Sequence, residues 1–468
     1  MNIKKEIILY LVLIISFLTR LFYIFKSSPP WWDTTVYAGM AKYIYSAGAV
    51  GLWEPIRPLL WPVLLGFFGF LGLDLIIIGK ILILIFSIGS VYLTFLLGKR
   101  FNFWIGIISS SLLSFMPLYF SFSNVTITDI PVLFFSLLAV YLFLKQKYFS
   151  SGLVCSIAFN IRFPYGLLFF SLLLSLILIF IIHKINLKKT FLYILKLCLG
   201  FSVFTILFLI FNYFMYNGKL FLPFIEANKI MSFGLWLWQK GFMYYIIELL
   251  KQNFILIFGI LGLLLCFKNY KNKDYLIISI IFLVFFSYFT YIKHKEFRYI
   301  ISVLPYLMIL TALGIDYFKN NLKGIFRKIF ISFIILLIIS YTIGITLFVF
   351  TYKPYYNPGT EEFYKYFTNY KGEIITSNPM FIVYSNDLKI NLFYSWEQSL
   401  EVYNKYLNSS NYIVVDGCEL YCLANDNYCN NYRDIFLEVV NKNSLVFNKS
   451  LIRGDEKCEM KIYKIIKR

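Results

Sequence analysis

Charged residues and histidine are scarce in this sequence. Only 15% of its 468 residues are charged, and the chain contains two histidines. Two histidines offer almost nothing to histidine-centred metal catalysis. The sequence also has no zinc motif, no P-loop, no dinucleotide-binding fingerprint and no nucleophile elbow of the serine-hydrolase type. These absences argue against the common zinc-dependent, nucleotide-dependent and serine-dependent classes of enzyme.

Apolar residues make up most of the chain. Hydrophobic residues account for 60% and aromatic residues for 21%, and the mean hydropathy is +0.72. A soluble protein of this length could not bury so much apolar surface, so a multi-pass membrane protein is predicted. The formal net charge of +20 would suggest nucleic acid in a soluble chain. Here Lys and Arg lie largely in short loops between apolar runs, so membrane orientation and lipid phosphate explain the charge better.

The apolar runs predict an all-α membrane domain over residues 1–350 with about eleven spanning helices, each needing roughly 20 residues. Residues 58–73 are expected to form an interfacial helix within a long first external loop, 26–75. Arg162 and Pro164 interrupt one tight pair of runs, which favours a corner there. The predicted spans are 7–25, 76–97, 104–122, 130–144, 150–163, 164–182, 191–215, 253–267, 275–292, 299–317 and 329–350.

The lysine and arginine clusters predict the orientation of these spans. They fall in one set of loops, which the positive-inside rule assigns to the cytoplasm. The N-terminus is then cytoplasmic, residues 7–25 are a first anchor rather than a cleaved signal, and the tail lies outside. Exceptions to the rule on the opposite side would be explained by an anionic ligand. They are Arg57, Arg162, Lys293, Lys295 and Arg298.

Residues 351–468 differ in composition and predict a small extracytoplasmic α/β domain, because short β-like runs alternate with helical stretches. The expected strands are 373–376, 412–415, 445–447 and 460–465, and the expected helices lie near 360–369, 396–407 and 431–440.

Four cysteines lie in this tail, and an even number in an extracytoplasmic domain predicts two disulfides with three alternative pairings. A zinc site is the alternative, but the tail has no histidine and its cysteines do not form paired C-x-x-C motifs. The disulfide candidates are Cys418, Cys422, Cys429 and Cys458.

Two acidic residues are candidates for chemistry near the membrane surface. Asp33 follows Trp31 and Trp32 and precedes an amphipathic stretch, so it can be the N-cap of a helix. Alternatively, its carboxylate accepts a proton from an incoming hydroxyl as a general base. Asp129 stands just before Pro131 and a new span, where it could also be a cap.

Several positively charged residues are also candidates for binding near the membrane surface. Glu54 and Arg57 are three residues apart and could form a local ion pair, which is worth little when exposed. Arg162 joins Lys295 and Arg298 as a candidate phosphate clamp, since Arg binds phosphate oxygens in a bidentate fork and Lys acts as a point charge. Among nearby acids, only Glu296 is expected to pair with this clamp.

The run from His294 to Tyr299, His-Lys-Glu-Phe-Arg-Tyr, places four ionisable side chains between the apolar runs 275–292 and 300–313. Charges at the edge of the bilayer core are costly and usually mark a pathway, a pocket or a partner. Ordinary interface anchoring is the alternative, because Lys and Arg extend their charged ends to the interface.

This run resembles the HKEFR-type signature of the multi-spanning glycosyltransferases called GT-C, which use polyprenyl-phosphate sugars, and especially the dolichyl-phosphate-mannose mannosyltransferases. Trp53-Glu54 and Ile56-Arg57-Pro58 are similar to motifs of the lipid-linked-oligosaccharide and GPI-anchor mannosyltransferases. Asp33 with Tyr37 resembles the D-x-x-x-Y opening of the protein mannosyltransferase and aminoarabinose transferase branch, and Asp129 fits the acidic residue of the second loop. The resemblance covers roughly residues 7–350.

The resemblance implies transfer of mannose or a similar hexose from a polyprenyl or dolichyl monophosphate to a lipid-linked glycan, glycolipid or protein on the outer face. The reaction would be an inverting single displacement. A polyprenyl-linked glycan transporter and a non-catalytic assembly subunit are the alternatives, although the sequence shows no paired repeats of the transporter type.

The resemblance also implies roles for the site residues. Asp33 is the expected catalytic base. No cofactor is assigned with certainty, and a divalent cation stays an open alternative that is not indicated, because Thr34 stands where many relatives have a second acid. The residues expected to orient acceptor or donor are Tyr37, Glu54, Arg57 and Asp129, and those expected to bind the donor phosphate are Arg162, His294, Lys295 and Arg298.

Overall fold

The structure is a computed structural model that describes residues 3–26, 30–233, 239–352, 358–420, 422, 426–453 and 456–467. The chain divides into two compact units, which are described separately. The helical unit consists of Met1–Ser27, Pro55–Trp61 and Lys80–Lys353. The mixed unit consists of Ser28–Glu54, Pro62–Gly79 and Pro354–Arg468.

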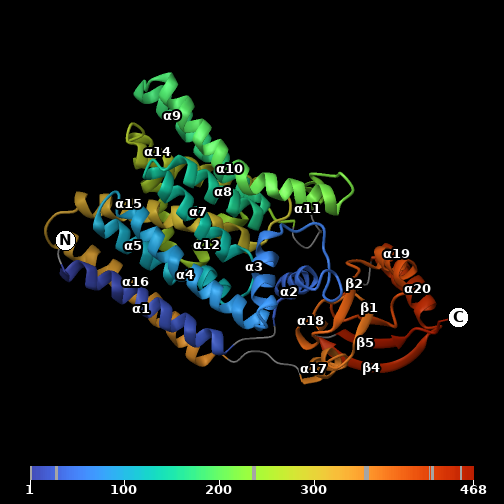
Figure 1. Cartoon of the computed structure of the whole chain (residues 1–468). Helices are drawn as coiled ribbons and strands as arrows, with labels where there is room; N and C mark the ends of the chain where they lie inside the picture. The colour runs from blue at the N-terminus through green and yellow to red at the C-terminus, as the bar shows by residue number, and fades with distance from the viewer. Residues whose placement is uncertain are drawn as a thin grey trace. The chain divides into compact units, whose positions relative to one another are not determined.

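The helical unit is built from apolar helices joined by short connections (Figure 1). Its elements are α1 (Ile3–Phe25), most of α4 (Leu75–Gly98), α5 (Phe103–Ser114), α6 (Pro117–Phe122), α7 (Asp129–Leu144), α8 (Tyr148–Ile161), η1 (Phe163–Tyr165), α9 (Gly166–His183), α10 (Leu187–Met215), α11 (Leu222–Phe233), α12 (Tyr244–Gln252), η3 (Phe254–Ile257), α13 (Phe258–Lys268), α14 (Lys273–Tyr291), η4 (Phe297–Ser302), α15 (Leu304–Asn321) and α16 (Gly324–Thr351).

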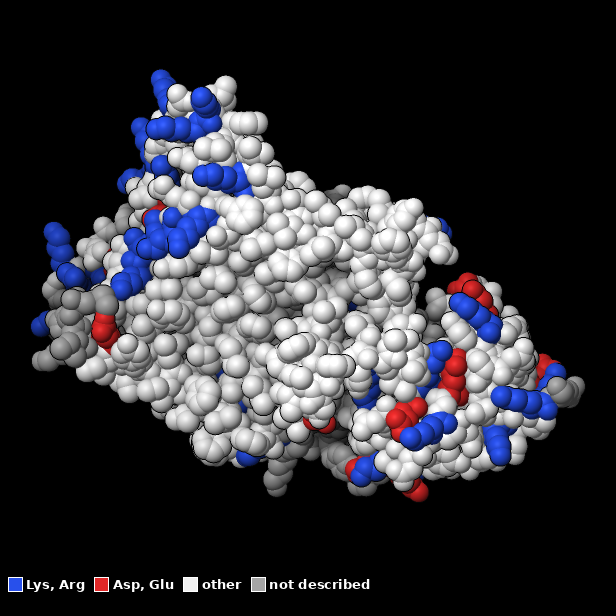
Figure 2. Space-filling view, in the orientation of Figure 1, with Lys and Arg blue, Asp and Glu red and all other residues white. Residues whose placement is uncertain are grey.

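All eleven predicted spans fall on helical segments, although some of them run from one helix into the next. These are 104–122, 150–163, 164–182, 253–267 and 299–317. Among the described residues, six helices are long and apolar enough to cross a membrane, and five further apolar helices are shorter. The chain is therefore a mostly helical, multi-pass membrane protein, and the number of eleven crossings stays a prediction. Figure 2 shows Lys and Arg gathered around the connection between α9 and α10, beside broad faces without charge.

The division between α5 and α6 follows from Pro117, which has no backbone N–H and cannot continue a helix. A helix that ends there leaves carbonyl oxygens without intrahelical partners. Arg20 of α1 is fully buried and serves this end, because its Nη2 donates to the carbonyl oxygen of Ser114 at 2.8 Å. Its Nε also donates to the Ser87 hydroxyl at 2.7 Å.

Close packing fixes the position of α8, which leads into the candidate site. A Cβ on Gly152 of α8 would lie 2.0 Å from the carbonyl oxygen of Leu197 in α10. A Cβ on Gly200 of α10 would lie equally close to the Phe149 carbonyl oxygen of α8. The two backbones can approach so closely only because both positions are glycine, as is common in membrane helix packing.

The mixed unit contains a five-stranded sheet in the order β2-β1-β3-β5-β4. β1 pairs in parallel with β2 and β3, while β5 is antiparallel to β3 and β4. The elements are α2 (Trp32–Tyr45), most of α3 (Leu60–Phe70), α17 (Pro358–Lys365), β1 (Gly372–Thr376), α18 (Phe381–Tyr384), β2 (Leu388–Leu392), α19 (Trp396–Tyr406), β3 (Tyr412–Asp416), α20 (Asn427–Val440), β4 (Ser444–Arg453) and β5 (Glu456–Lys464).

Four strands overlap the predicted runs, and β2 was not predicted. The core of the sheet domain includes Ile375, Ile413, Phe436 and Tyr463. Two disulfides are present: Cys418 with Cys458, and Cys422 with Cys429. The first disulfide joins the end of β3 to β5.

Candidate functional site

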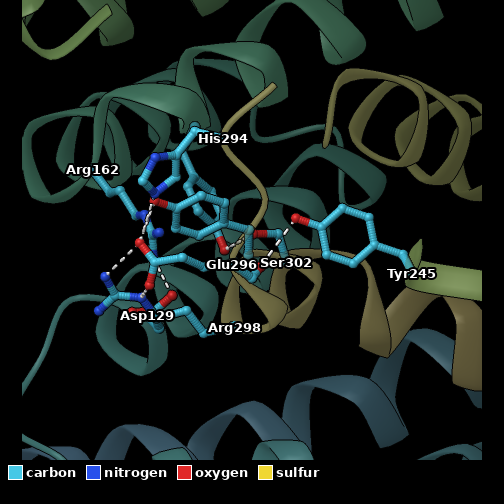
Figure 3. A network of polar contacts seen from close by, with 9 residues as sticks. Asp129, Arg162, Tyr245, His294, Glu296, Arg298 and Ser302 are labelled. Atoms are coloured by element: carbon cyan, nitrogen blue, oxygen red, sulfur yellow. Dashed lines mark hydrogen bonds and ion pairs between the residues drawn. The ribbon is translucent and has the colours of Figure 1, made fainter. Parts of the chain in front are cut away.

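Three segments that are distant in sequence meet in a polar cluster of the helical unit (Figure 3). Asp129 is the first residue of α7, and Arg162 is the C-cap of α8. The third segment runs from His294 into η4. Pro164 lies just beyond Arg162 in η1, and Arg162 itself has extended backbone angles, so the chain leaves the helix there as the sequence predicted.

Asp129, which is buried, and Arg162, which is half-buried, form an ion pair. Nη1 of Arg162 donates to Oδ1 of Asp129. The Asp129 carboxylate beside it stabilises the charge of the guanidinium. The guanidinium also lies over the Tyr299 ring, with its carbon 4.9 Å from the ring centroid. Arg162 therefore stays charged and is held in one orientation.

Glu296 is the centre of the second part of the cluster. Its Oε1 accepts a hydrogen bond from the Tyr299 hydroxyl at 2.8 Å and lies 3.0 Å from Nε2 of His294. Nε of Arg298 lies 2.7 Å from Oε2, and Nη2 donates to Oε1 at 3.1 Å. Burial opposes ionisation, but the hydrogen bond from His294 and the charge of Arg298 outweigh it and lower the pKa of Glu296 to about 2.

Two tyrosines hold the backbone that carries this cluster. The Tyr245 hydroxyl, from α12, donates to the carbonyl oxygen of Glu296 at 3.0 Å. The Tyr165 hydroxyl donates to Ser302 Oγ at 2.9 Å, at the end of η4. Sequence reasoning missed Tyr245 because α12 was not predicted. Its only sequence signal is the amphipathic run from Tyr244 to Gln252.

Lys295 has a different environment from the arginines. It is buried, and its Nζ donates to the carbonyl oxygen of Lys240 at 3.0 Å. His294 forms an antiparallel bridge with Gln239 next to this contact. Burial lowers the pKa of Lys295. Lys295 therefore joins the run 294–296 to residues 239–240.

The structure brings together Asp129, Arg162, His294 and Arg298 from the predicted set. It also corrects two expectations. Asp129 is not a helix cap, because Thr128 occupies the N-cap position of α7. The expectation that only Glu296 could pair with the cationic clamp is wrong, because Asp129 pairs with Arg162.

The remaining predicted residues lie outside this cluster. Asp33, Tyr37 and Glu54 belong to the mixed unit, and Arg57 lies in the Pro55–Trp61 segment of the helical unit. Tyr37 and Glu54 are buried, whereas Asp33 and Arg57 are half-buried. The capping alternative for Asp33 is wrong, because α2 begins at Trp32 and its N-cap is Trp31, without a side-chain cap hydrogen bond.

No family model and no curated protein matches the sequence. Solved structures do match. ArnT from Cupriavidus metallidurans bound to undecaprenyl phosphate is 10% identical, with a TM-score of 0.66 over 98% of each chain. The Archaeoglobus fulgidus oligosaccharyltransferase is 11% identical, with a TM-score of 0.59 over 88% of this chain and 69% of that chain. The mycobacterial arabinofuranosyltransferase AftD is 10% identical, with a TM-score of 0.50 over 98% of this chain and 40% of that chain.

The chain has the GT-C fold. The match to ArnT extends over the membrane helices and the C-terminal domain (residues 354–468), because it covers nearly the whole of both chains. The GT-C fold predicted from His294 to Tyr299 is thereby confirmed. At this identity the likeness concerns the fold, and the roles of individual residues are argued from their geometry.

Proposed function

We propose that this protein is a membrane glycosyltransferase. It takes mannose or a similar hexose from a polyprenyl or dolichyl monophosphate and transfers it, with inversion, to a lipid-linked glycan, glycolipid or protein on the outer face. The observation that carries this proposal is the pair of half-buried arginines, Arg162 and Arg298, each oriented by a carboxylate within a GT-C fold. A neighbour with this fold, ArnT, binds undecaprenyl phosphate.

The charges of the cluster suit a phosphate ligand. Asp129 and Glu296 balance the two arginines, and Lys295 adds one positive charge nearby. The carboxylates hold the guanidiniums in place, and a guanidinium binds phosphate oxygens through a planar fork of N–H donors. Fixed donors aimed at a leaving phosphate stabilise the charge that develops on it during transfer.

The proposed reaction is a single displacement at the anomeric carbon of the donor sugar. The acceptor oxygen forms a bond to this carbon, and the bond between the carbon and the phosphate oxygen breaks with its electron pair leaving on the phosphate. Asp33 takes the proton of the acceptor hydroxyl. We assign the orientation of acceptor or donor to Tyr37, Glu54 and Arg57, and Asp129 acts on the donor through Arg162.

The assay uses the purified protein in liposomes with polyprenyl-phosphate-linked [14C]mannose, glucose or galactose and a membrane-lipid extract as acceptor. Transfer of label to the extract, lost in Asp33→Asn while a photoreactive polyprenyl-phosphate analogue still crosslinks, supports the proposal. Movement of labelled donor across the bilayer without transfer would identify a transporter instead. Crosslinking without transfer, unchanged in Asp33→Asn, would identify an assembly subunit.

A further inference from the structure

A further buried cation lies in the mixed unit, outside the arginine cluster. Lys42 of α2 is 6% exposed, and its ammonium donates three hydrogen bonds. The acceptors are the carbonyl oxygens of Ile382 at 2.7 Å and Ser385 at 2.9 Å, and Oδ1 of Asn386 at 3.1 Å. An ammonium has three N–H donors, so all of them are used. Burying a charge is costly, and a residue that only filled this space would be apolar.

The acceptors belong to the single connection between β1 and β2, which includes α18. The carboxyl ends of β1 and β3 hold this connection in place. Nδ2 of Asn378 donates to Oδ2 of Asp416 at 2.8 Å and to the Tyr364 hydroxyl at 3.0 Å. Oδ1 of Asn378 accepts from the backbone N–H of Met380 at 2.9 Å. The site that receives Lys42 is therefore fixed by the sheet of the C-terminal domain.

Backbone hydrogen bonds between Gly51 and β2 also join the segment after α2 to the sheet. The N–H of Gly51 donates to the carbonyl oxygen of Leu388, and the N–H of Ile390 donates to the carbonyl oxygen of Gly51, both at 2.8 Å. Gly51 has a φ of +90°, and a Cβ there would lie 2.3 Å from the carbonyl oxygen of Gly39 in α2. Only glycine fits this position, because its φ is positive and the backbone of α2 at Gly39 and Tyr43 approaches it closely.

α2 is the helix that carries Asp33 in its first turn, and Tyr37 follows one turn later. Lys42 lies at its other end. We propose that Lys42 is a positioning residue: by binding the β1–β2 connection, it lets the C-terminal domain hold α2 in the orientation that Asp33 needs for proton transfer. This inference rests on the proposed function. In this proposal, the C-terminal domain supports the first external loop, 26–75, which carries Asp33.

The test measures both the helix and the reaction. Lys42→Met removes the three hydrogen bonds, Lys42→Arg keeps the charge and several donors, and Asn386→Ala removes one acceptor in case Lys42→Met fails to fold. Lys449→Met is the matched control, because Lys449 pairs on the surface of the same unit with Glu362. Hydrogen exchange of residues 32–45 is measured in full-length protein, together with kcat and the donor KM.

We expect Lys42→Met to speed amide exchange in α2 and to lower kcat by about tenfold or more, since small misplacements cost this much. The donor KM should change little, Lys42→Arg should recover part of kcat, and Lys449→Met should match wild type. In an Asp33→Asn background, Lys42→Met should cause little further loss, because residues acting through one another are not additive.

Unchanged exchange in α2 of a folded Lys42→Met or Asn386→Ala protein would overturn the inference. An equal loss of kcat in the wild-type and Asp33→Asn backgrounds would also overturn it. If the wild-type protein transfers no sugar at all, the proposed function fails, and the exchange data still decide whether the C-terminal domain holds α2.

Discussion

The arginine cluster of the helical unit and α2 of the mixed unit both hold cations at least partly away from solvent, but these cations have different partners. In the helical unit, Arg162 and Arg298 are bound by the carboxylates of Asp129 and Glu296. In the mixed unit, Lys42 is bound by carbonyl and amide oxygens of one connection. A carboxylate stabilises the charge of a guanidinium and orients it. Neutral oxygens offset less of the free energy that burying a charge costs.

The pKa of Lys42 shows the cost of burying a cation that has no carboxylate as a direct partner. Burial lowers the pKa of Lys42 to about 8, and the more distant Asp74 and Asp387 offset only part of the effect. Arg162, by contrast, has the Asp129 carboxylate as a direct partner, which stabilises its charge. We therefore expect Arg162 and Arg298 to bind an anion and Lys42 to hold backbone. The units should accordingly control donor binding and turnover separately.

Asp33→Asn gives the largest effect that this separation predicts. The amide keeps the shape of the side chain and removes the proton acceptor, so turnover should fall by roughly 10² or more. Donor affinity should not change, because the residues that we propose to bind the phosphate are in the other unit. Single-turnover transfer and donor photocrosslinking measure the two quantities, and near-normal transfer by the folded variant would remove Asp33 from the mechanism.

Arg298→Lys should lower donor affinity, whereas Asp33→Asn should lower turnover. Lysine keeps the charge but loses the planar fork, so donor affinity should fall about tenfold, equivalent to about 1.4 kcal/mol, and Arg298→Ala should be worse. Arg100→Lys is the matched control, because Arg100 also binds a carboxylate, that of Asp274, through two nitrogens. If Arg298 only anchors η4 at the interface, its lysine variant will bind donor as wild type does.

Arg20→Met tests whether a buried cation bound by neutral oxygens is structural in the helical unit too. The variant loses hydrogen bonds to Ser16, Ser87 and Ser114. Hydrogen bonds from a charged group are worth about 1.5–3 kcal/mol, so the melting temperature in detergent should fall. Donor affinity of the folded fraction should be normal, and a selective loss of donor binding would contradict the comparison.

Glu296→Gln probes the charge state of the cluster. The pKa of Glu296 is lowered in the folded protein, so its contribution to the free energy of unfolding is complete above the usual carboxyl pKa of 4.5. It is lost as the pH falls from about 4.5 to about 2. Denaturation curves over this range should show the loss in wild type and in a Glu362→Gln surface control, but a smaller one in Glu296→Gln.

The last prediction concerns the cysteines and needs no substitution, because chemical labelling of the wild-type protein tests it. Alkylation in denaturant should modify three residues before reduction, namely Cys155, Cys198 and Cys266, and all seven afterwards. In sealed, right-side-out vesicles, a membrane-impermeant reagent should reach the four tail cysteines only after reduction. Labelling of those four without reductant would contradict the disulfides, and protection after reduction would contradict the predicted orientation.

The sequence predicted the helices well because long apolar runs bounded by Lys, Asn and Pro leave few alternatives. It named Arg162, His294 and Arg298 as a site, since charged residues beside apolar runs are conspicuous. It could not predict that Asp129 pairs with Arg162, 33 residues away, because partner choice depends on how α7 and α8 pack.

Other features had weak local signals. β2 has five residues, Leu-Lys-Ile-Asn-Leu, and its parallel partner β1 precedes it by a helical connection, so its pairing is not local. The contact of Lys42 with residues 382–386 spans 340 positions or more. A lysine within an amphipathic stretch predicts a solvated face, and only the folded sheet reveals that this one is buried.

The bridge at Gly51 affects how the protein can be divided for experiments. β2 is the outermost strand on its side of the sheet, and Gly51 satisfies part of its backbone. A fragment cut from residue 354 onward would lack Gly51 and expose that strand, and bare outer strands pair with other chains and aggregate. Joining residues 28–54 to the C-terminal domain by a short linker should give a more soluble fragment than the C-terminal residues alone.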